Sequence, residues 1–243
     1  MADVQKRDSP KRAWPSPAPV GAPAKRTRAP RSDASEMLRA LREKITSHEL
    51  QPGTKLIEQD LAAAFKVSRA RVRDVFSVLE QRGLIERFPN RGAVVARLTA
   101  KHVIELFQTR EVLEGLAVRL ATENTARDHW DGLIIAFGAP AEQAIRNGEF
   151  EDYATILNQF RREVTATCNN ALVASLLDLM LERTAYVVRR VIMVPGRALV
   201  GLQDHRAVLA AMKAGNGEEA ERLKRANIHA ARLVFERYQQ FVL

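Results

Sequence analysis

The sequence predicts a mainly α-helical protein, with a small mixed α/β part at the N-terminal end and an all-α bundle of six to seven helices after it. Two observations carry this prediction. Short helical patterns followed by two short strand patterns end near residue 97. From Thr99 onward strand signals almost vanish, and long helical stretches follow at about 99–124, 127–148 (broken near Gly138-Ala139-Pro140), 150–168, 171–193, 199–214 and 217–241.

Composition divides the chain into residues 1–33, 34–97 and 98–243. Residues 1–32 contain eight Lys/Arg, two Asp and six prolines, so they cannot form a packed core, and we expect a disordered basic arm. The arm either adds salt-dependent affinity for a nucleic acid or is a passive extension; the sequence favours neither.

Charge is concentrated at the front of the chain. The net charge of +9 comprises +6 in residues 1–32 and +4 in residues 34–97, whereas residues 98–243 are neutral and Asp33 removes one charge. This distribution indicates that the front part meets a nucleic acid. The single cysteine, Cys168, excludes an intramolecular disulfide, and no apolar run reaches transmembrane length. We therefore expect a cytoplasmic protein without a membrane partner.

The second part begins with a helix over Ser35–His48, whose apolar side chains Leu38, Leu41 and Ile45 face inward. Pro52-Gly53 turns the chain into a short helix over residues 58–65, and Lys66-Val67 forms a tight turn before the next helix. Two short helices joined in this way form a helix-turn-helix.

The helix after this turn has two distinct sides. Val72, Val75, Phe76 and Leu79 make one apolar stripe, Ser68 is a candidate N-cap, and Gly83 ends the helix. Arg69 and Arg73 lie one turn apart on another side, together with Ser77. A cationic face at the start of a helix suits the DNA major groove, because arginine donates to guanine or phosphate and a helix N-terminus attracts anions.

Residues 84–88 and 93–96 predict two strands joined by the turn Pro89-Asn90-Arg91-Gly92. This pattern is typical of the wing of a winged helix-turn-helix. Arg91 would lie at the tip, beside a glycine that lets backbone approach phosphate closely.

Residues 35–96 resemble the GntR family of bacterial transcription regulators, through Leu50-Gln51-Pro52-Gly53-Thr54-Lys55-Leu56, Asp60-Leu61-Ala62, Val67-Ser68-Arg69, Val72-Arg73 and Pro89-Asn90-Arg91-Gly92. The resemblance implies DNA contacts at Gln59, Ser68, Arg69, Ala70, Arg73 and Gly92. We add Arg71 and Arg91 as further cations. Ala70 and Arg71 replace the family's usual Thr-Pro pair, which removes one hydroxyl contact and adds one cation.

Residues 98–243 resemble the all-helical effector-binding (FCD) domain of the FadR branch of this family, through Arg110-x-x-Leu113-Glu114, Phe160 with Asn170, and His205-Arg206-Ala207-Val208-Leu209 leading to Ala214-Gly215-Asn216. Many members of that branch hold a divalent metal with one Asp and three His. An ungapped alignment places Leu157, Arg161, His205 and Asn227 at these positions, so only His205 remains. We therefore expect no metal or other cofactor.

Helical spacing places several polar side chains on inward stripes. On the last helix the predicted apolar stripe contains Ala220, Leu223, Asn227, Ala231, Val234 and Tyr238, and His229 lies on the solvent side. The inward polar residues are Arg110, Glu114, Arg161, His205 and Asn227, with Asn158 beside them. One interpretation is internal pairing of Arg110 with Glu114 and a satisfied core histidine. The other, which we favour, is a pocket in which Arg161, His205 and Asn227 bind a carboxylate effector.

Together these patterns and resemblances predict a homodimeric DNA-binding transcription regulator, of the repressor kind, that responds to a small organic acid. The alternatives are a metal-dependent member of the same family and a DNA-binding dimer without an effector. An enzyme is not expected, because the five histidines show no metal-ligand spacing and no nucleophile elbow, phosphate loop or dinucleotide fingerprint is present.

Overall fold

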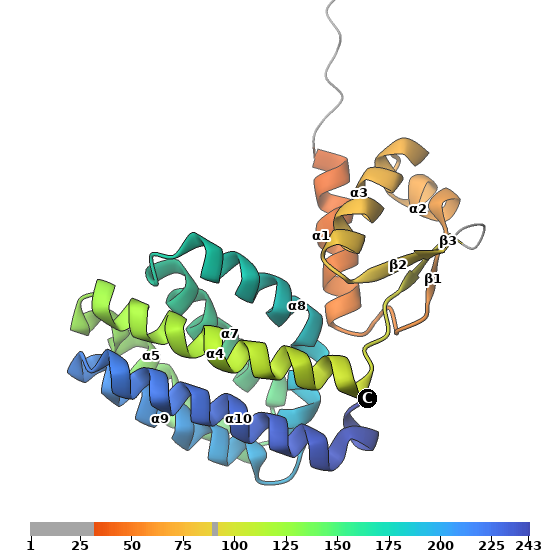
Figure 1. The fold of residues 1–243 in the computed structure, drawn as a ribbon. Helices are drawn as coiled ribbons and strands as arrows, with labels where there is room; N and C mark the ends of the chain where they lie inside the picture. Colours follow the sequence, from red (N-terminus) through yellow and green to blue (C-terminus); the bar gives the residue numbers. More distant parts are fainter. Residues whose placement is uncertain (1–31, 89–91) are drawn as a thin grey trace, which may run out of the picture. The chain divides into compact units, whose positions relative to one another are not determined.

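The N-terminal folded part is a winged helix-turn-helix, as the sequence predicts (Figure 1). In this computed structural model, residues 32–88 and 92–243 are described; residues 1–31 of the predicted arm and the wing-tip residue Arg91 lie outside them. The predicted end of the arm at residue 33 is wrong by two residues, because Ser32 and Asp33 begin the first helix. Helix α1 covers Ser32–Thr46, α2 covers Glu58–Ala64 and α3 covers Arg69–Gln81. Strands β1 (Lys55–Leu56), β2 (Ile85–Phe88) and β3 (Gly92–Val95) complete it.

The sheet has three antiparallel strands in the order β1-β3-β2, one more than the two expected from the sequence. The extra strand, β1, has only two residues, Lys55 opposite Val94 and Leu56 opposite Ala93, which is too short for a periodic pattern. Leu56, Ala93 and Val95 enter the same core as the predicted stripe of α3. The wing is therefore fixed to the helix that it flanks.

The second part is entirely helical among its described residues. Its elements are α4 (Ala100–Asn124), a 3-10 turn (Arg127–Trp130), α5 (Asp131–Ala136), α6 (Ala139–Arg146), α7 (Phe150–Thr167), α8 (Ala171–Met193), α9 (Arg197–Ala214) and α10 (Gly217–Val242). The predicted break near Gly138 separates α5 from α6, and Pro140 lies in the first turn of α6. No helix of the described chain is long and apolar enough to cross a membrane.

Local signals account for the helix boundaries. The side chain of Asn170 accepts from the backbone N–H of Val173 and caps α8, and Asn216 caps α10 in the same way. Gly215, with φ of +76°, ends α9 in the left-handed conformation that glycine adopts without strain.

Two apolar clusters fill the helical part. The larger one contains side chains from all helices between α4 and α10, among them Trp130, Phe137, Phe160 and Leu202. The smaller one joins α4, α8 and α10 around Val103, Phe107, Val187 and Phe235. Helices α4 and α10 lie side by side along much of their length (Figure 1). Polar side chains between these clusters are therefore enclosed by helices on several sides.

Candidate functional sites

Helix α3 presents arginines to solvent and apolar side chains to the core. Val72, Val75, Phe76 and Leu79 are buried, as predicted. Ser68 accepts from the backbone N–H of Arg71 at 3.3 Å and caps the helix. The predicted DNA-contact residues that are described are all exposed: Gln59, Ser68, Arg69, Ala70, Arg71, Arg73 and Gly92. Gly92 has φ of +78° where β3 begins.

Helix α2 holds two of these arginines in place. Arg69 Nη2 donates to Gln59 Oε1 at 2.9 Å. Arg73 Nε donates to the two carboxylate oxygens of Glu58 at 3.1 and 3.0 Å. Glu58 was not predicted as part of this surface. Its signal in the sequence is a carboxylate at the start of α2, the helix that precedes the arginine-bearing α3. The N-terminal parts of α2 and α3 thus form one polar surface.

A cavity of about 40 Å³ lies inside the helical part. Side chains from α4, α7, α8, α9 and α10 line it, and the polar or charged ones are Arg110, Tyr153, Arg161, Arg197, His205, Lys224 and Asn227. Four of the predicted effector residues, Arg110, Arg161, His205 and Asn227, are therefore brought together. Glu114, the fifth inward residue, contacts two of the lining side chains.

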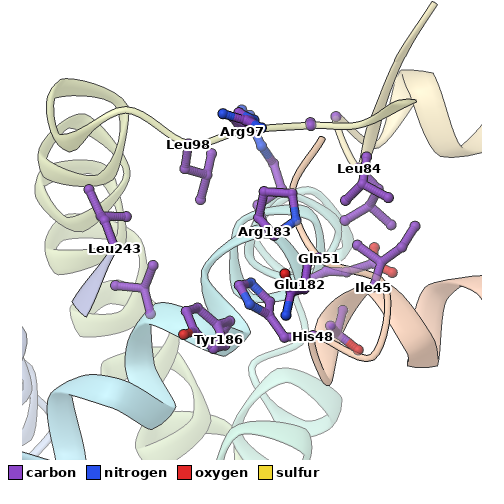
Figure 2. A pocket seen from close by; sticks show the side chains of 16 residues that line it. Ile45, His48, Gln51, Leu84, Arg97, Leu98, Glu182, Arg183, Tyr186 and Leu243 are labelled. Atoms are coloured by element: carbon purple, nitrogen blue, oxygen red, sulfur yellow. The ribbon is translucent and has the colours of Figure 1, made fainter. Parts of the chain in front are cut away.

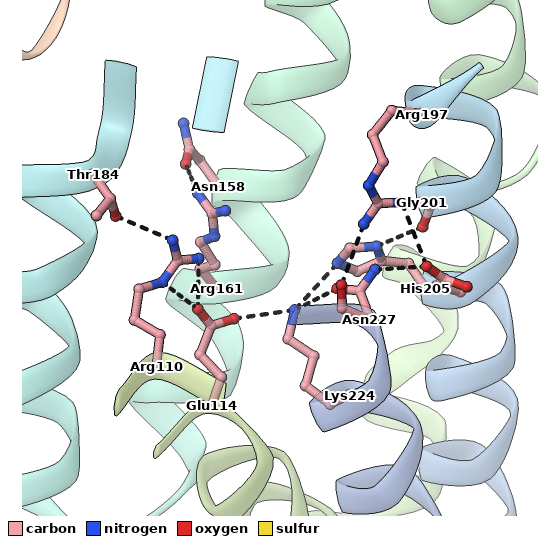
Figure 3. A network of polar contacts seen from close by, with 11 residues as sticks. Arg110, Glu114, Asn158, Arg161, Thr184, Arg197, Gly201, His205, Lys224 and Asn227 are labelled. Atoms are coloured by element: carbon pink, nitrogen blue, oxygen red, sulfur yellow. Dashed lines mark hydrogen bonds and ion pairs between the residues drawn. The ribbon is translucent and has the colours of Figure 1, made fainter. Parts of the chain in front are cut away.

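Glu114 is shared by two cations in this interior (Figure 3). Arg110 Nε donates to Glu114 Oε1 at 2.8 Å, and Lys224 Nζ lies 3.1 Å from Glu114 Oε2. Arg110 also donates to the hydroxyl of Thr184 on α8 at 3.1 Å. Burial alone would raise the pKa of Glu114, but the charges of Arg110, Lys224 and Arg161 hold it well below its usual range. The carboxyl group is therefore ionised.

His205 is a neutral hydrogen-bond acceptor toward Lys224. Its Nδ1 lies 2.8 Å from the carbonyl oxygen of Gly201, which can only accept, so Nδ1 carries the proton. Its Nε2 lies 3.3 Å from Lys224 Nζ, which donates. Burial, followed by the charge of Lys224, lowers the pKa of His205 well below its ordinary value. Phe137 and Phe160 pack on the ring, with centroids 5.2 and 5.3 Å away.

Asn227 and Arg197 form the other side of the network. Asn227 Nδ2 donates to Asp204 Oδ2 at 2.9 Å, and Arg197 Nη2 donates to the backbone oxygen of Asn227 at 3.2 Å. Arg197 Nη1 forms an ion pair with Asp204 at 3.5 Å but has no hydrogen-bond partner among the described residues. Since Arg197 is only 8% exposed, this donor is buried and available.

Arg161 lacks a carboxylate partner within the described parts of the chain. Its hydrogen bond goes to the neutral amide oxygen of Asn158 at 3.1 Å. Burial, and then the positive charge of Arg110, lowers the pKa of Arg161 to about 10, and Glu114 offsets only part of this. Asn158 itself is exposed, so it contacts the site from outside. An anion beside Arg161 would relieve the unbalanced charge.

The stripe predicted for α10 is partly wrong. Lys224, Ile228 and Phe235 are buried beside Asn227, whereas Leu223 is half-buried and Tyr238 is 39% exposed. The physical reasons are the ion pair with Glu114, which allows a lysine to be buried, and a break in helical geometry at Tyr238. His229 is exposed and faces Glu111, in agreement with its predicted solvent side.

Four polar residues at this cavity were not predicted from the sequence: Lys224, Arg197, Asp204 and Tyr153. Lysine is the residue type least expected in a core, and Arg197 precedes the predicted start of its helix by two residues. A usable signal was present for Lys224, because it follows the predicted Ala220 by one helical turn.

The described side chains of this interior lack the ligands that a divalent metal ion needs. Across residues 32–88 and 92–243, no group of three or more His, Cys, Asp or Glu side chains is placed to hold a metal. The only free lone pair of His205 faces an ammonium group instead. This arrangement does not fit a divalent cation.

Two larger hollows lie nearer the surface. One, of about 490 Å³, shares the lining residues Leu157, Arg161 and Val188 with the inner cavity and therefore lies next to it. The other, of about 460 Å³, is lined by His48, Arg97, Glu182, Arg183 and Tyr186 (Figure 2). It contains none of the predicted site residues.

Helix α8 connects the polar network of the helical part to the winged helix. Its Glu182 forms ion pairs with Arg42 of α1 and with Arg82, the C-cap of α3. Asp178, one turn earlier, also pairs with Arg82. Thr184 on the same helix receives the hydrogen bond from Arg110. A displacement of α8 would therefore reach both parts.

Comparisons with known proteins agree with this arrangement. The model of the FCD domain matches residues 105–230, and the model of bacterial regulatory proteins of the gntR family matches residues 34–95. The chain is 29% identical over 184 residues to the Bacillus subtilis protein named "Uncharacterized HTH-type transcriptional regulator YdhC", which covers 74% of this chain and 81% of that one.

A second relative is 30% identical over 181 residues, covering 73% of this chain and 77% of its own length. It is the Paenarthrobacter nicotinovorans protein named "Probable D-xylose utilization operon transcriptional repressor". Among solved structures, E. coli McbR/YncC has the same fold, with a TM-score of 0.69 at 20% identity over 85% of this chain and 99% of that one.

The buried neutral histidine makes stability depend on pH. Above its unfolded pKa of about 6.5, His205 is neutral in both states and adds no pH dependence. Below that pKa the histidine of the unfolded chain binds a proton, whereas His205 in the folded chain stays neutral. Burial and the charges of Lys224 and Arg161 disfavour its protonation, and Glu114 offsets them only partly. The free energy of unfolding of the wild type should therefore fall by up to about 1.4 kcal/mol per pH unit between pH 6.5 and 5, and His205→Gln should remove this fall. Urea unfolding across this range measures the effect.

The exposed His229→Gln variant is the control and should follow the wild type. Equal pH slopes for His205→Gln and wild type would show that His205 is protonated in the folded chain.

Proposed function

The chain belongs to the GntR family of bacterial regulatory proteins and is a transcriptional regulator with a DNA-binding helix-turn-helix and an FCD effector-binding domain; we propose that it is a homodimeric repressor controlled by a small carboxylate. The observation that carries the effector proposal is Arg161, a half-buried guanidinium that lines both the inner cavity and the outer hollow and whose hydrogen bond goes only to a neutral amide among the described residues. The family consists of transcriptional regulators, so no catalytic activity is assigned.

On the DNA side, the exposed start of α3 enters the major groove. Arg69, Arg71 and Arg73 supply cations, Ser68 and Ala70 lie beside them at the start of α3, and Gln59 accepts from Arg69. Gly92 is exposed at the start of β3 in the wing. A homodimer would place two such helices on two half-sites, which is how helix-turn-helix proteins read palindromic operators. Such a protein acts in the bacterial cytoplasm, with the nucleoid.

On the effector side, a carboxylate enters beside Arg161, where a planar guanidinium offers two parallel donors. His205, Asn227 and the newly found Lys224 and Arg197 surround the same cavity. The rival interpretation of internal pairing accounts for Arg110 and Glu114, which do pair. It leaves Arg161 without a charged partner in the described chain, and the carboxylate supplies one.

Regulation requires that the carboxylate bind one arrangement of the protein better than another, because only this difference shifts the equilibrium. Helix α8 supports such a coupling, since Thr184 contacts the network and Glu182 contacts α1 and the end of α3. An anion bound at Arg161 would change the electrostatic environment of Arg110. Arg110 donates to Thr184, so the change would act on α8.

We expect Arg69→Ala and Arg73→Ala each to weaken operator binding by about 1–3 kcal/mol, because each removes a charge-assisted contact to a base or phosphate. Gel-shift titrations use a DNA fragment selected by the wild-type protein from a random pool, and random DNA for comparison. Arg222→Ala, which removes an exposed arginine of α10 paired with Glu219, is the control. Wild-type affinity in both α3 variants would refute the assignment of α3 as recognition helix.

We expect purified protein to contain no stoichiometric Zn, Ni or Mn, because Lys224 Nζ lies 3.3 Å from the His205 nitrogen that a metal would need. Elemental analysis after purification without chelators measures this. One metal per subunit, lost in His205→Ala, would restore the metal-dependent alternative.

We expect Arg161→Ala to weaken binding of a carboxylate by roughly 1.5–3 kcal/mol while operator binding by the free protein stays unchanged. A thermal-shift screen of small organic acids identifies the acid, and calorimetry compares the variants. Arg162→Ala, which removes the adjacent exposed arginine of α7, is the matched control. Equal affinity in wild type and Arg161→Ala would place the carboxylate elsewhere.

A further inference from the structure

The cavity carries more positive than negative charge. Four cations line it, namely Arg110, Arg161, Arg197 and Lys224. The carboxylates in contact with these side chains, among the described residues, are Glu114 and Asp204. His205 contributes no charge, because its pKa lies well below neutral pH. Two positive charges are therefore left without a counter-charge in the interior, where such an excess is costly.

Two places beside the cavity can receive an anion. Arg161 on α7 has no carboxylate partner and is bonded only to Asn158 within the described chain. Arg197 on α9 is ion-paired with Asp204 but keeps one buried Nη1 donor without a hydrogen bond. Figure 3 shows these two guanidinium groups on different sides of the Lys224 ammonium group. A ligand with one anionic group at Arg161 would leave the Nη1 donor of Arg197 without a hydrogen bond.

Arg197 is held in its position by the local backbone. A Cβ atom at Gly201, one turn later on α9, would lie 3.0 Å from Arg197 Nη1. Glycine at this position thus lets the guanidinium lie close against its own helix. Asp204 contacts the same Nη1 at 3.5 Å and fixes it from one side. The arginine is therefore built into the wall rather than free to leave it.

Lys224 lines the same cavity and is fixed by several contacts. Its ammonium group lies 3.1 Å from Glu114, 3.3 Å from His205 and 3.5 Å from Asn227, and 5.1 Å from the ring centroid of Phe160. It is 2% exposed. The cavity wall therefore holds a third cation that a ligand cannot displace easily.

The volumes favour a short ligand. The inner cavity measures about 40 Å³, and Arg161 also lines the outer hollow of about 490 Å³. A small inner cavity suits a short chain between two anionic groups better than a sugar acid or a nucleotide.

We propose that the ligand of this cavity is a short dianion, with a carboxylate at Arg161, a second anionic group at Arg197, and Lys224 as a further cation in the wall of the same cavity. The proposal rests on the proposed function of the same site and specifies its ligand class. The second anionic group accepts from Nη1 of Arg197, which lies 3.5 Å from Asp204 but has no hydrogen bond in the described chain. A monocarboxylate would leave that donor buried and unused.

The experiment compares dianions with monoanions of the same length and shape. Malonate, succinate and glutarate are titrated into the full-length protein by calorimetry at pH 7.5, and so are their half-amides. Ionic strength is matched with NaCl, because screening otherwise differs between the two charges. We expect at least one dianion to bind ten-fold or more tightly than its own half-amide.

Variants locate the second anionic group. Arg197→Gln should weaken the dianion ten-fold or more and change the half-amide less than three-fold. Arg197→Lys keeps the charge and should keep a preference for the dianion, and melting of the free variants checks that each folds. Arg222→Gln, an exposed arginine of α10 outside the cavity, should behave as wild type.

The outcomes separate the two proposals. Half-amides that bind as tightly as dianions, or Arg197→Gln that weakens both equally, would overturn the dianion while leaving a carboxylate effector in place. Binding only of larger acids from the general screen would also overturn it. If no acid of any size binds, the dianion and the proposed carboxylate effector both fail.

Discussion

The pairing of Glu114 with Arg110 and Lys224 is the interaction on which the interior of the helical domain depends. Two cations, 1% and 2% exposed, are taken out of water where α4 and α10 pack together. A buried ion is tolerated only when an opposite charge and hydrogen bonds compensate it. One carboxylate does this for both, accepting from Arg110 at 2.8 Å and lying 3.1 Å from Lys224. Because Glu114 is thereby occupied, it cannot serve Arg161 as well, and the cavity is left electropositive.

The position of Lys224 also decides the state of the histidine. An ammonium group against Nε2 keeps His205 neutral, and the carbonyl of Gly201 fixes the other nitrogen. The imidazole therefore acts as an acceptor toward a cation that belongs to the chain itself. The hydrogen-bond roles of this part of the interior are thus fixed by the chain itself.

Much of this could be predicted from the sequence, because periodic burial determines which side of a helix faces inward. The apolar stripe of α3 was predicted from its spacing, and its residues are buried: Val72, Val75, Phe76 and Leu79. The same helical spacing correctly predicted that Arg110, Arg161 and His205 point toward the inside of the bundle, where they line one cavity. Side chains whose burial depends on a partner far along the chain were not predictable in this way. Lys224 is buried because of Glu114, and β1 exists because β3 pairs with it. The DNA-contact and effector roles themselves remain predictions.

The ion pair between Glu58 and Arg73 bears on the cost of the proposed binding to DNA. Both hydrogen bonds to Glu58 come from Arg73 Nε, so this carboxylate orients the guanidinium group, and no hydrogen bond within the described chain uses its terminal amino groups. Such groups can form a two-pronged contact with a guanine edge. If Arg73 contacts DNA as proposed, part of its rotamer freedom is already restricted in the free protein and would not be lost again on binding. Preorganisation of this kind would lower the cost of association without adding a single contact.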